Sequence, residues 1–405
     1  MTTIYLTTNS PGEVSTWLRP TVKALLAGAG GQAPAPEGIV VFLNPCVYAT
    51  GSEARVAQEI PGVDTVITPW ETVRFALLGR RPQALRRRNH KKGALLHLGG
   101  EITLSAWLAR RLNVPAFLYT EGFVNSVSAF QRIFVPHQRA ADKAARCGAP
   151  PERVEIIGNL MVDAIDTPWS SPSQALRHLG LSVGPPTVAV LPGSRLHEWE
   201  IALPFFAAVI RELRRRIPDM QAIIAVSAFA GELRATWFPG GELQRWVTVE
   251  GERMLAVNDQ TAAAVFAADL VLTLPGSNTV EIAALGRPMI VAAPLHRPEL
   301  IPLDGLPGLI GSIPLIGKPL KRAAVLRFSQ RVPFIALPNA WAGRQIAPEL
   351  RGEDLQPWDV TTVAYDLLMQ DDVRERMGIE LKSVVGSAGA SQRIAAALLR
   401  AVSPP

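Results

Sequence analysis

Cysteine and histidine are scarce in this chain, with two cysteines and six histidines among 405 residues. Cys46 and Cys147 form no CxxC pair, and the histidines form no HExxH motif. A zinc site or a disulfide framework would need such clustering. The sequence therefore predicts no metal site and two spectator thiols.

Long apolar runs are also missing. A helix that spans a bilayer needs about 18 or more uninterrupted apolar residues, and the richest stretch, Ala262 to Leu274, is interrupted by Asp269. The first ten residues, MTTIYLTTNS, lack a basic segment leading into an apolar one, so they do not read as a signal peptide. These features predict a cytoplasmic protein that neither spans a membrane nor is secreted.

Charge is modest overall and concentrated in one place. Hydrophobic residues make up 48% of the chain and charged residues 19%, with a formal net charge of +6. This composition favours a substantial core.

Seven Lys and Arg residues fall between Arg80 and Lys92. Beside these cations the segment Trp70–Lys92 carries the apolar residues Trp70, Val73, Phe75, Leu77, Leu78 and Leu85. Pro82 divides the segment into two short pieces. We expect this segment to dock on an anionic membrane surface. The alternative is a core-packed helix followed by a solvated basic loop; nucleic acid is disfavoured because no aromatic platform interleaves with the cations.

Short, apolar, β-branched runs alternate with helical patterns along the chain, which predicts an α/β fold with parallel sheets. The helical patterns include Ile201–Arg216 and Val373–Val402. The expected strands are Ile4–Thr8, Ile39–Leu43, Thr65–Thr68, Ala94–Leu98, Ala116–Tyr119, Ile133–Val135 and Val154–Ile157, then Thr187–Leu191, Ala222–Val226, Val247–Val249, Leu270–Leu274, Met289–Ala292 and Phe334–Leu337.

The two series of strands predict two doubly wound, Rossmann-like domains that face a cleft. We expect an N-terminal acceptor-binding domain over residues 1–165, a Ser-, Pro- and Gly-rich linker over 166–186, a nucleotide-sugar-binding domain over 187–372 and a helical segment over 373–405. Ligands of such domains bind beyond the carboxyl ends of the strands.

Two strand–turn–helix corners in the second domain are suited to an anion. The segment TVAVLPGSRLHE ends a strand at Gly193, Ser194 and Arg195, before a helix whose N-terminus favours phosphate oxygens. The segment LVLTLPGSNTVEIAALGRP repeats the arrangement with Gly276, Ser277, Asn278 and Thr279. Glu281 follows and could accept hydrogen bonds from ribose hydroxyls. The alternatives are an ordinary corner with a surface arginine, and a carboxylate that only complements the helix dipole.

A third segment, LPNAWAGRQIAPEL, carries Asn339 and Arg344, which could both reach a polar ligand or simply belong to a solvated turn. The chain contains no GxxxxGK[ST] and no GxGxxG after its first strand. These absences disfavour a P-loop NTPase and a dinucleotide dehydrogenase, and the sequence predicts no cofactor.

Taken in order, LPGSR..E, PGSNTVE and LPN.WAGR...PEL resemble the signature blocks of the lipid-A-disaccharide synthase family, and IIGNLMVDA at Ile156–Ala164 resembles a further block. The resemblance is good from about Val154 to Leu350 and loose over the first 150 residues. It implies a GT-B fold and inverting transfer of a glucosamine-type sugar, acylated in that family, from UDP to a lipid acceptor at the inner membrane surface.

By the same resemblance, the UDP part would be held by Gly193, Ser194, Arg195, Gly276, Ser277, Asn278, Thr279 and Glu281, with Asn339 and Arg344 near the same site. Arg195 would also stabilise the departing UDP. Inverting transfer needs a general base. We predict Glu101, which follows the strand Ala94–Leu98; Glu13 and Glu121 are its rivals, and Glu101 could instead be a helix-start carboxylate.

The N-terminal half departs from the family pattern. The expected glycine-rich turn reads Asn9–Val14, and two other blocks read LGGEIT and YTEGF. A UDP-sugar epimerase or hydrolase of the same fold, and a catalytically silent nucleotide-sugar-binding protein, therefore remain as alternatives. We predict a UDP-sugar donor, a lipid acceptor and peripheral attachment to the inner face of the cell membrane. Formation of a homodimer is left open.

Overall fold

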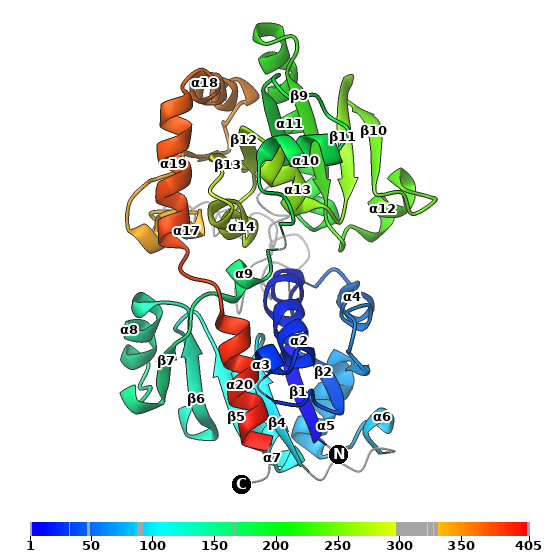
Figure 1. The fold of residues 1–405 in the computed structure, drawn as a ribbon, viewed down its shortest axis with the longest axis vertical. Coiled ribbons are helices and arrows are strands. Elements are labelled where there is room, and N and C mark those ends of the chain that lie inside the picture. Colours follow the sequence, from blue (N-terminus) through cyan, green and yellow to red (C-terminus); the bar gives the residue numbers. More distant parts are fainter. Residues whose placement is uncertain are drawn as a thin grey trace. The chain divides into compact units, whose positions relative to one another are not determined.

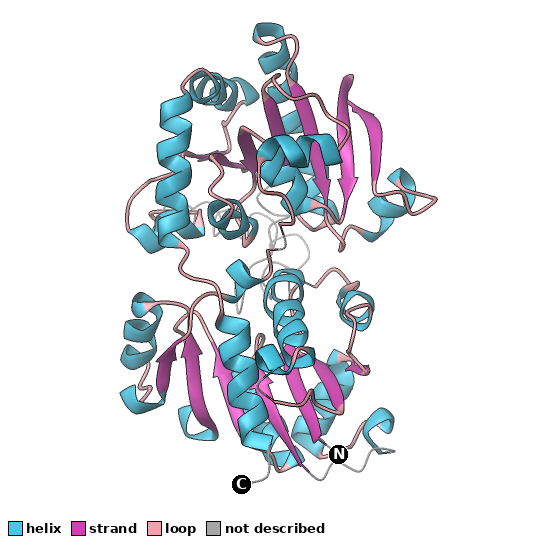
Figure 2. Ribbon diagram, in the orientation of Figure 1, coloured by secondary structure: helices cyan, strands magenta, loops and turns pink. Residues whose placement is uncertain are grey.

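The computed structural model describes residues 2–31, 33–46, 49–86, 92–165, 167–296, 322, 327 and 331–402. The chain forms two compact units, one of residues 1–164 and 386–405 and the other of residues 165–385. In Figure 1 the unit that begins the chain, blue to cyan, therefore also contains the red helix near the C-terminus. Each unit is an α/β structure built on its own sheet (Figure 2).

The first unit is built on a parallel sheet of seven strands in the order β3-β2-β1-β4-β5-β6-β7. Its central strands are buried on both faces, which explains their continuous apolar sequence. The strands are β1 (Thr2–Thr8), β2 (Gly38–Leu43), β3 (Thr65–Ile67), β4 (Lys92–His97), β5 (Ala116–Tyr119), β6 (Phe130–Val135) and β7 (Val154–Ile156).

Helices cover both faces of this sheet. They are α1 (Pro11–Glu13), a π-helical turn (Val14–Leu18), α2 (Arg19–Leu26), α3 (Gly28–Gly31), α4 (Glu53–Gln58), α5 (Pro69–Leu78), α6 (Gln83–Arg86), α7 (Ile102–Leu112), α8 (Gln138–Arg146), α9 (Leu160–Asp163) and α20 (Ala390–Val402). The last of these, α20, packs on α2 and β4 with Ile394 and Leu398 fully buried. The Asp163 carboxylate caps α20 by accepting hydrogen bonds from the Gly389 and Ser391 amides, both at 2.6 Å.

The second unit has a seven-stranded sheet in the order β10-β11-β9-β8-β12-β13-β14, parallel except for the β10–β11 pair. Its strands are β8 (Thr187–Leu191), β9 (Gln221–Val226), β10 (Gln244–Val249), β11 (Glu252–Asn258), β12 (Leu270–Thr273), β13 (Met289–Pro294) and β14 (Glu349–Gly352). The helices described are α10 (Pro172–His178), α11 (Leu196–Arg216), α12 (Gly231–Trp237), α13 (Thr261–Ala267), α14 (Asn278–Ala284), α17 (Leu337–Ala342), α18 (Pro357–Leu368) and α19 (Asp371–Val384).

The structure differs from the expected elements in three places. Phe334–Leu337 is not a strand, because Leu337 and Pro338 begin helix α17, where proline is well tolerated in the first turn. Strand β14 was not predicted, since its four residues are half-buried and form no apolar run. Strand β11 was also missed; it pairs with β10 through a tight turn at Glu250-Gly251, where both residues have positive φ, as a two-residue hairpin loop requires.

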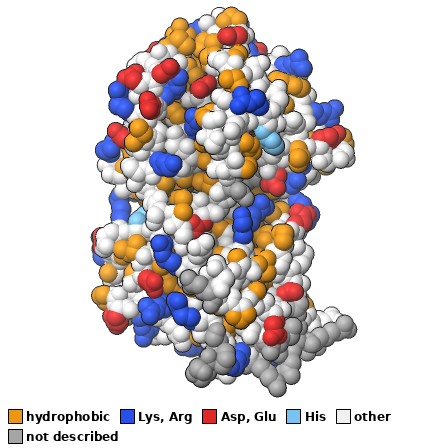
Figure 3. Space-filling view, in the orientation of Figure 1, with side chains coloured by type: hydrophobic (Ala, Val, Ile, Leu, Met, Phe, Trp, Pro, Cys, Tyr) orange, Lys and Arg blue, Asp and Glu red, His pale blue; other side chains and the backbone are white. Residues whose placement is uncertain are grey.

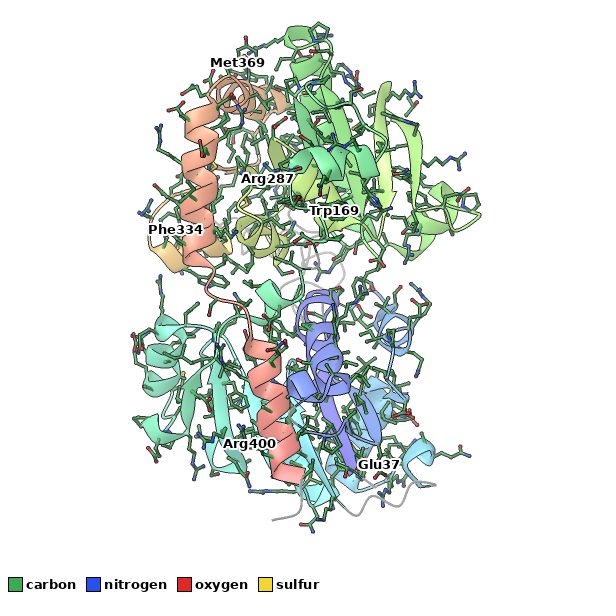
Figure 4. The ribbon with its side chains drawn as sticks, in the orientation of Figure 1. Glu37, Trp169, Arg287, Phe334, Met369 and Arg400 are labelled. Atoms are coloured by element: carbon green, nitrogen blue, oxygen red, sulfur yellow. The ribbon has the colours of Figure 1, made fainter. Side chains whose placement is uncertain are left out.

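The division of the chain also differs from the expected one. Residues 167–186 belong to the second unit, where α10 packs on α13. Trp169, labelled in Figure 4, lies 5.2 Å from the His178 ring, and His178 in turn bonds Gln260 at 2.9 Å. The predicted C-terminal helical segment is divided, since α19 belongs to the second unit and α20 to the first.

Candidate functional site

Each sheet has one point at which the strand order reverses direction. In the first unit the reversal lies between β1 and β4, and in the second it lies between β8 and β12. Open α/β sheets bind ligands beyond the carboxyl ends of the strands at such a point. The loops that follow these four strands are therefore the candidate ligand-binding loops.

The loop after β8 is held in shape by Glu198, in the first turn of α11. The Ser194 amide donates to Glu198 Oε2 at 2.7 Å and the Arg195 amide donates to it at 3.0 Å. Arg195 Nη1 lies 2.6 Å from Glu198 Oε1. A Cβ on Gly193, which has φ +105°, would lie 2.2 Å from Glu198 Oε2, so only glycine fits there.

Glu198 is the residue of this corner that the sequence analysis did not select. Its signal was present, because a glutamate three residues after the helix N-cap is the capping-box position. Trp199 adds a second hold on the loop by donating from Nε1 to the Gly193 carbonyl at 3.1 Å. The loop that contains Gly193, Ser194 and Arg195 is thus fixed by two side chains of the following helix.

The loop after β12 forms the second corner. Thr279 is fully buried and donates from Oγ1 to the Gly276 carbonyl at 2.7 Å. Asn278 donates from Nδ2 to Thr273 Oγ1 and so ties α14 back to its strand. These two residues shape the corner, whereas the half-buried Ser277 hydroxyl forms no hydrogen bond with any described residue.

Glu281 follows on α14, in its first turn. Its half-buried carboxylate has no hydrogen bond or ion pair with any described residue. Burial raises the pKa of Glu281 to about 7. Beyond the far end of α14, Arg287 (labelled in Figure 4) lies 5.1 Å above the Phe266 ring and donates to the Phe266 carbonyl, which anchors the helix.

The third motif serves the fold at the positions that were predicted to meet a ligand. Asn339 is fully buried, and its Nδ2 donates to the Ala347 carbonyl at 2.8 Å and to Glu349 Oε1 at 2.7 Å. Its Oδ1 accepts hydrogen bonds from the Ile346 and Ala347 amides. All of the hydrogen-bonding capacity of this amide is therefore used inside the protein.

Arg344 lies on the surface and pairs with Glu380 of α19 at 2.9 Å. Acidic and basic side chains intermix over α18 and α19, as Figure 3 shows, and two further ion pairs lie on α19 itself. An exposed pair of this kind is weak. Among the described residues, the ion pair of Arg344 is with Glu380 and not with a residue of the Gly193 or Gly276 loop.

Glu101 caps helix α7 in the first unit. Its exposed carboxylate accepts hydrogen bonds from the Thr103 amide at 3.1 Å and from Asn125 Nδ2 at 3.3 Å. Partial burial alone would raise the pKa of Glu101, but these hydrogen bonds to Thr103 and Asn125 outweigh it and lower the pKa. A carboxylate so stabilised in its ionised form is a weak proton acceptor.

Glu13 and Glu121, the two rivals of Glu101, are half-buried. Loss of water around the carboxylate raises the pKa of Glu13 to about 7, and the charge of Glu121 adds to the rise. Burial likewise raises the pKa of Glu121 to about 7, opposed by Lys143. Their loops follow β1 and β5, so Glu13 belongs to the switch point itself.

Beneath this edge lies a buried polar cluster. His97 Nδ1 lies 2.8 Å from Ser105 Oγ and 3.2 Å from Thr7 Oγ1, and the two hydroxyls are 2.9 Å apart. Burial lowers the pKa of His97 to about 3, so the imidazole is neutral. Within the described ranges, no three His, Cys, Asp or Glu side chains gather where they could hold a metal ion.

Two solved structures share this architecture, although sequence identity is low. MurG from Acinetobacter baumannii has a TM-score of 0.52 at 12% identity, covering 98% of this chain and 99% of its own. The MnaA–UDP structure from S. aureus has a TM-score of 0.52 at 15% identity, covering 97% and 95%. The two parallel α/β sheets therefore form a GT-B fold, as the sequence predicted.

The family is found by sequence. Residues 151–297 match the family model described as lipid-A-disaccharide synthetase. The lipid-A-disaccharide synthase of Synechocystis is 25% identical over 253 residues, and that of Syntrophus aciditrophicus is 29% identical over 245. These alignments cover 61% and 60% of this chain, which spans 56% of the length of either relative. The predicted resemblance is confirmed, and the chain is a distant relative of this glycosyltransferase family.

Proposed function

We propose that this protein is an inverting glycosyltransferase that moves a glucosamine-type sugar from UDP to a lipid acceptor. One observation carries the proposal. The two glycine-containing corners at Gly193 and Gly276 follow the adjacent strands β8 and β12, at the switch point of the second unit, inside the region that matches the family. Neighbouring parallel strands end at the same edge, so both corners can meet one diphosphate.

The contacts of these residues support the following roles within the proposed donor site. The backbone at Gly193 and Gly276 and the Ser277 hydroxyl would face the diphosphate, with Ser194, Asn278 and Thr279 shaping the loops. Arg195 would offset the negative charge that grows as UDP departs. We therefore expect Arg195→Ala to lower turnover more than donor affinity. Glu281, whose carboxylate has no hydrogen bond with any described residue, would accept hydrogen bonds from the ribose. Asn339 and Arg344 are proposed only to support the fold around this site.

The proposal extends to a membrane surface, on which the family's acceptors reside. Three apolar side chains are exposed on α5: Trp70 at 68%, Leu77 at 49% and Leu78 at 64%. With Arg74, whose guanidinium lies 5.8 Å from the Trp70 ring, they occupy one helical face at spacings of four, seven and eight residues. Arg80 and Arg81 follow and are exposed.

The segment Trp70–Lys92 is thus divided. Phe75 and Leu85, which were predicted with the interfacial residues, are instead buried in the core. Residues 87–91, including Arg87 and Arg88, lie outside the described residues. Among the helices that the structure describes, none is long and apolar enough to cross a bilayer. The exposed face of α5 and the cations after it support a peripheral attachment to the inner face of the cell membrane.

The deciding experiment is a UDP-release assay. The purified protein is incubated with UDP-N-acetylglucosamine and related UDP-sugars, with and without a membrane lipid extract, and the lipid products are identified by mass spectrometry. Release of UDP that depends on the extract supports a transferase. Turnover without extract would instead support an epimerase or hydrolase, and UDP binding without turnover a silent binding protein.

A further inference from the structure

The loops that follow β1 and β4 interlock at the switch point of the first unit. The Glu13 carboxylate lies directly over Gly99, where a Cβ would come within 1.9 Å of Glu13 Oε2. Gly99 also donates its amide to the Thr7 carbonyl at 3.1 Å, which holds the second loop against the first strand. The glycine at position 99 is therefore required for Glu13 to occupy its place.

Glu13 is oriented by the backbone that precedes it. Its Oε2 accepts hydrogen bonds from the Asn9 and Ser10 amides, both at 3.2 Å. The Ser10 side chain also stabilises this carboxylate by a hydrogen bond, while the Asn9 and Ser10 amides both bond Oε2 and leave Oε1 without a backbone donor among the described residues. One carboxylate oxygen is thus fixed and the other is available, which is the arrangement that a general base needs to meet a hydroxyl.

Asn44, at the end of β2, supports the same place. Its side chain is 1% exposed, and its Nδ2 donates to the Gly99 carbonyl at 2.8 Å. A Cβ on Gly100 would lie 2.4 Å from the Asn44 Cβ, so the second glycine admits this contact. Asn44 Oδ1 is buried and has no hydrogen-bond partner among the described residues. A buried acceptor without a donor is unfavourable.

The other two carboxylates fit this role less well. The Glu101 carboxylate is exposed, and the hydrogen bonds that it accepts from Thr103 and Asn125 outweigh its partial burial and lower its pKa, which makes it the weaker proton acceptor. Glu121 is half-buried, but no hydrogen bond from a described residue orients it. Glu101 also follows a switch-point strand and also has one oriented oxygen, so the difference is that the Glu13 carboxylate is half-buried and packed over Gly99, whereas that of Glu101 is exposed.

We propose that Glu13, and not Glu101, is the general base of the transfer, and that Asn44 positions the Gly99-Gly100 loop beside it. The inference rests on the proposed function. In the transfer step, the oxygen of the acceptor hydroxyl bonds to the anomeric carbon of the sugar while Glu13 Oε1 takes the proton of that hydroxyl. The bond from the anomeric carbon to the phosphate oxygen breaks, and UDP leaves with the electron pair.

The test compares variants of the full chain, with UDP-N-acetylglucosamine as donor and membrane lipid extract as acceptor source. Glu13→Gln is expected to lower kcat by about 10²–10⁴-fold without changing UDP affinity in calorimetry. Glu101→Gln represents the competing assignment and should cause the smaller loss. Gly99→Ala should also lower kcat, because its Cβ displaces the carboxylate; Gly240→Ala, where the added Cβ meets only the flexible Glu242 side chain at 3.2 Å, is the matched control.

The outcomes separate this inference from the proposed function. Wild-type protein that shows no extract-dependent UDP release fails as a transferase and overturns both. Wild-type turnover that survives Glu13→Gln, or falls further with Glu101→Gln, overturns only the assignment of the base. If Glu13→Gln melts far below the wild type, Glu13→Asp is tested instead. Aspartate keeps the carboxylate but moves its oxygens, because its side chain is shorter. A kcat equal to that of the wild type would contradict the proposal that the position of Oε1 matters.

Discussion

The Asn339 amide lies 2.7 Å from the Glu349 carboxylate, across the segment that joins α17 to β14. Glu349 also accepts hydrogen bonds from the Ile335 and Ala336 amides, at 2.8 and 2.9 Å. Two motif residues thus hold the start of a helix beside the start of an edge strand. The family resemblance implies that Asn339 lies near the nucleotide. Its contacts in the structure favour a structural role instead.

Replacement of Asn339 by alanine should therefore reduce stability and spare donor affinity. The substitution leaves the Ile346 and Ala347 amides without their acceptor, and each buried group without a partner costs about 1–3 kcal/mol. We expect a lower melting temperature in calorimetry with an unchanged UDP affinity for the folded protein. Arg344→Ala, in the same motif, is the control and should change stability by no more than about 1 kcal/mol. A stable Asn339→Ala protein that binds UDP weakly would restore the ligand-binding role.

Glu281 should show a dependence on pH in both stability and binding. The pKa of its carboxyl is about 7 in the folded protein, against 4.5 for a glutamate in water, so the folded form holds its proton more tightly. The protonated Glu281 carboxyl therefore stabilises the folded state fully below about pH 4.5, and this stabilisation is lost as pH rises to about 7. Glu281→Gln should consequently raise the melting temperature at pH 8 relative to the wild type, and not at pH 4.5.

The same substitution should weaken UDP binding at pH 8. An ionised carboxylate that accepts ribose hydrogen bonds contributes about 1.5–3 kcal/mol, which glutamine replaces only in part. The difference in UDP affinity between wild type and Glu281→Gln should shrink below pH 7, where the wild-type carboxyl is protonated. Equal UDP affinity at pH 8, measured by calorimetry, would remove Glu281 from the donor site.

Most of the fold could be predicted from the sequence, because buried parallel strands are continuous apolar runs that hardly resemble anything else. The strands that were missed, β11 and β14, lack such a run or belong to a hairpin at the sheet edge. The site was harder to predict. The pattern of Gly193 and Glu281 is visible in the sequence, but the difference between Glu13 and Glu101 depends on which loops pack together, and spacing along the chain carries no such information.

Gly193 should tolerate no side chain. Its φ is +105°, and an alanine Cβ there would lie 2.2 Å from Glu198 Oε2, so Gly193→Ala must push the Glu198 carboxylate away from the Ser194 and Arg195 amides. We expect UDP affinity to fall by about tenfold or more, the equivalent of one charge-assisted hydrogen bond. Gly241→Ala is the matched control, since Gly241 also has positive φ, +76°, but its added Cβ would meet nothing within 4 Å.

If Gly193→Ala binds UDP as tightly as Gly241→Ala does, the loop at Gly193 plays no part in UDP binding. Glu198→Ala provides a second measure of the same loop. It should lower UDP affinity in the same direction, because the two backbone amides and the Arg195 guanidinium lose the carboxylate that fixes them. A tighter complex with Glu198→Ala would show instead that this carboxylate competes with the phosphates for the amides.

Attachment to membranes should depend on the exposed face of α5. A double variant, Trp70→Ser with Leu78→Ser, removes the two most exposed apolar side chains of that face. It should weaken sedimentation with vesicles of phosphatidylglycerol and phosphatidylcholine by about tenfold or more, since burying one such side chain contributes about 1.5–3 kcal/mol. The fold should be unaffected, because neither side chain belongs to the core.

Trp358→Ser is the control. Trp358 is 62% exposed and lies on α18 of the other unit, so its replacement should leave sedimentation with the vesicles unchanged. Binding that falls with added salt but not with the double variant would indicate attachment by the cations alone. Wild-type protein that ignores anionic vesicles even at low salt would contradict the membrane proposal and favour a water-soluble acceptor.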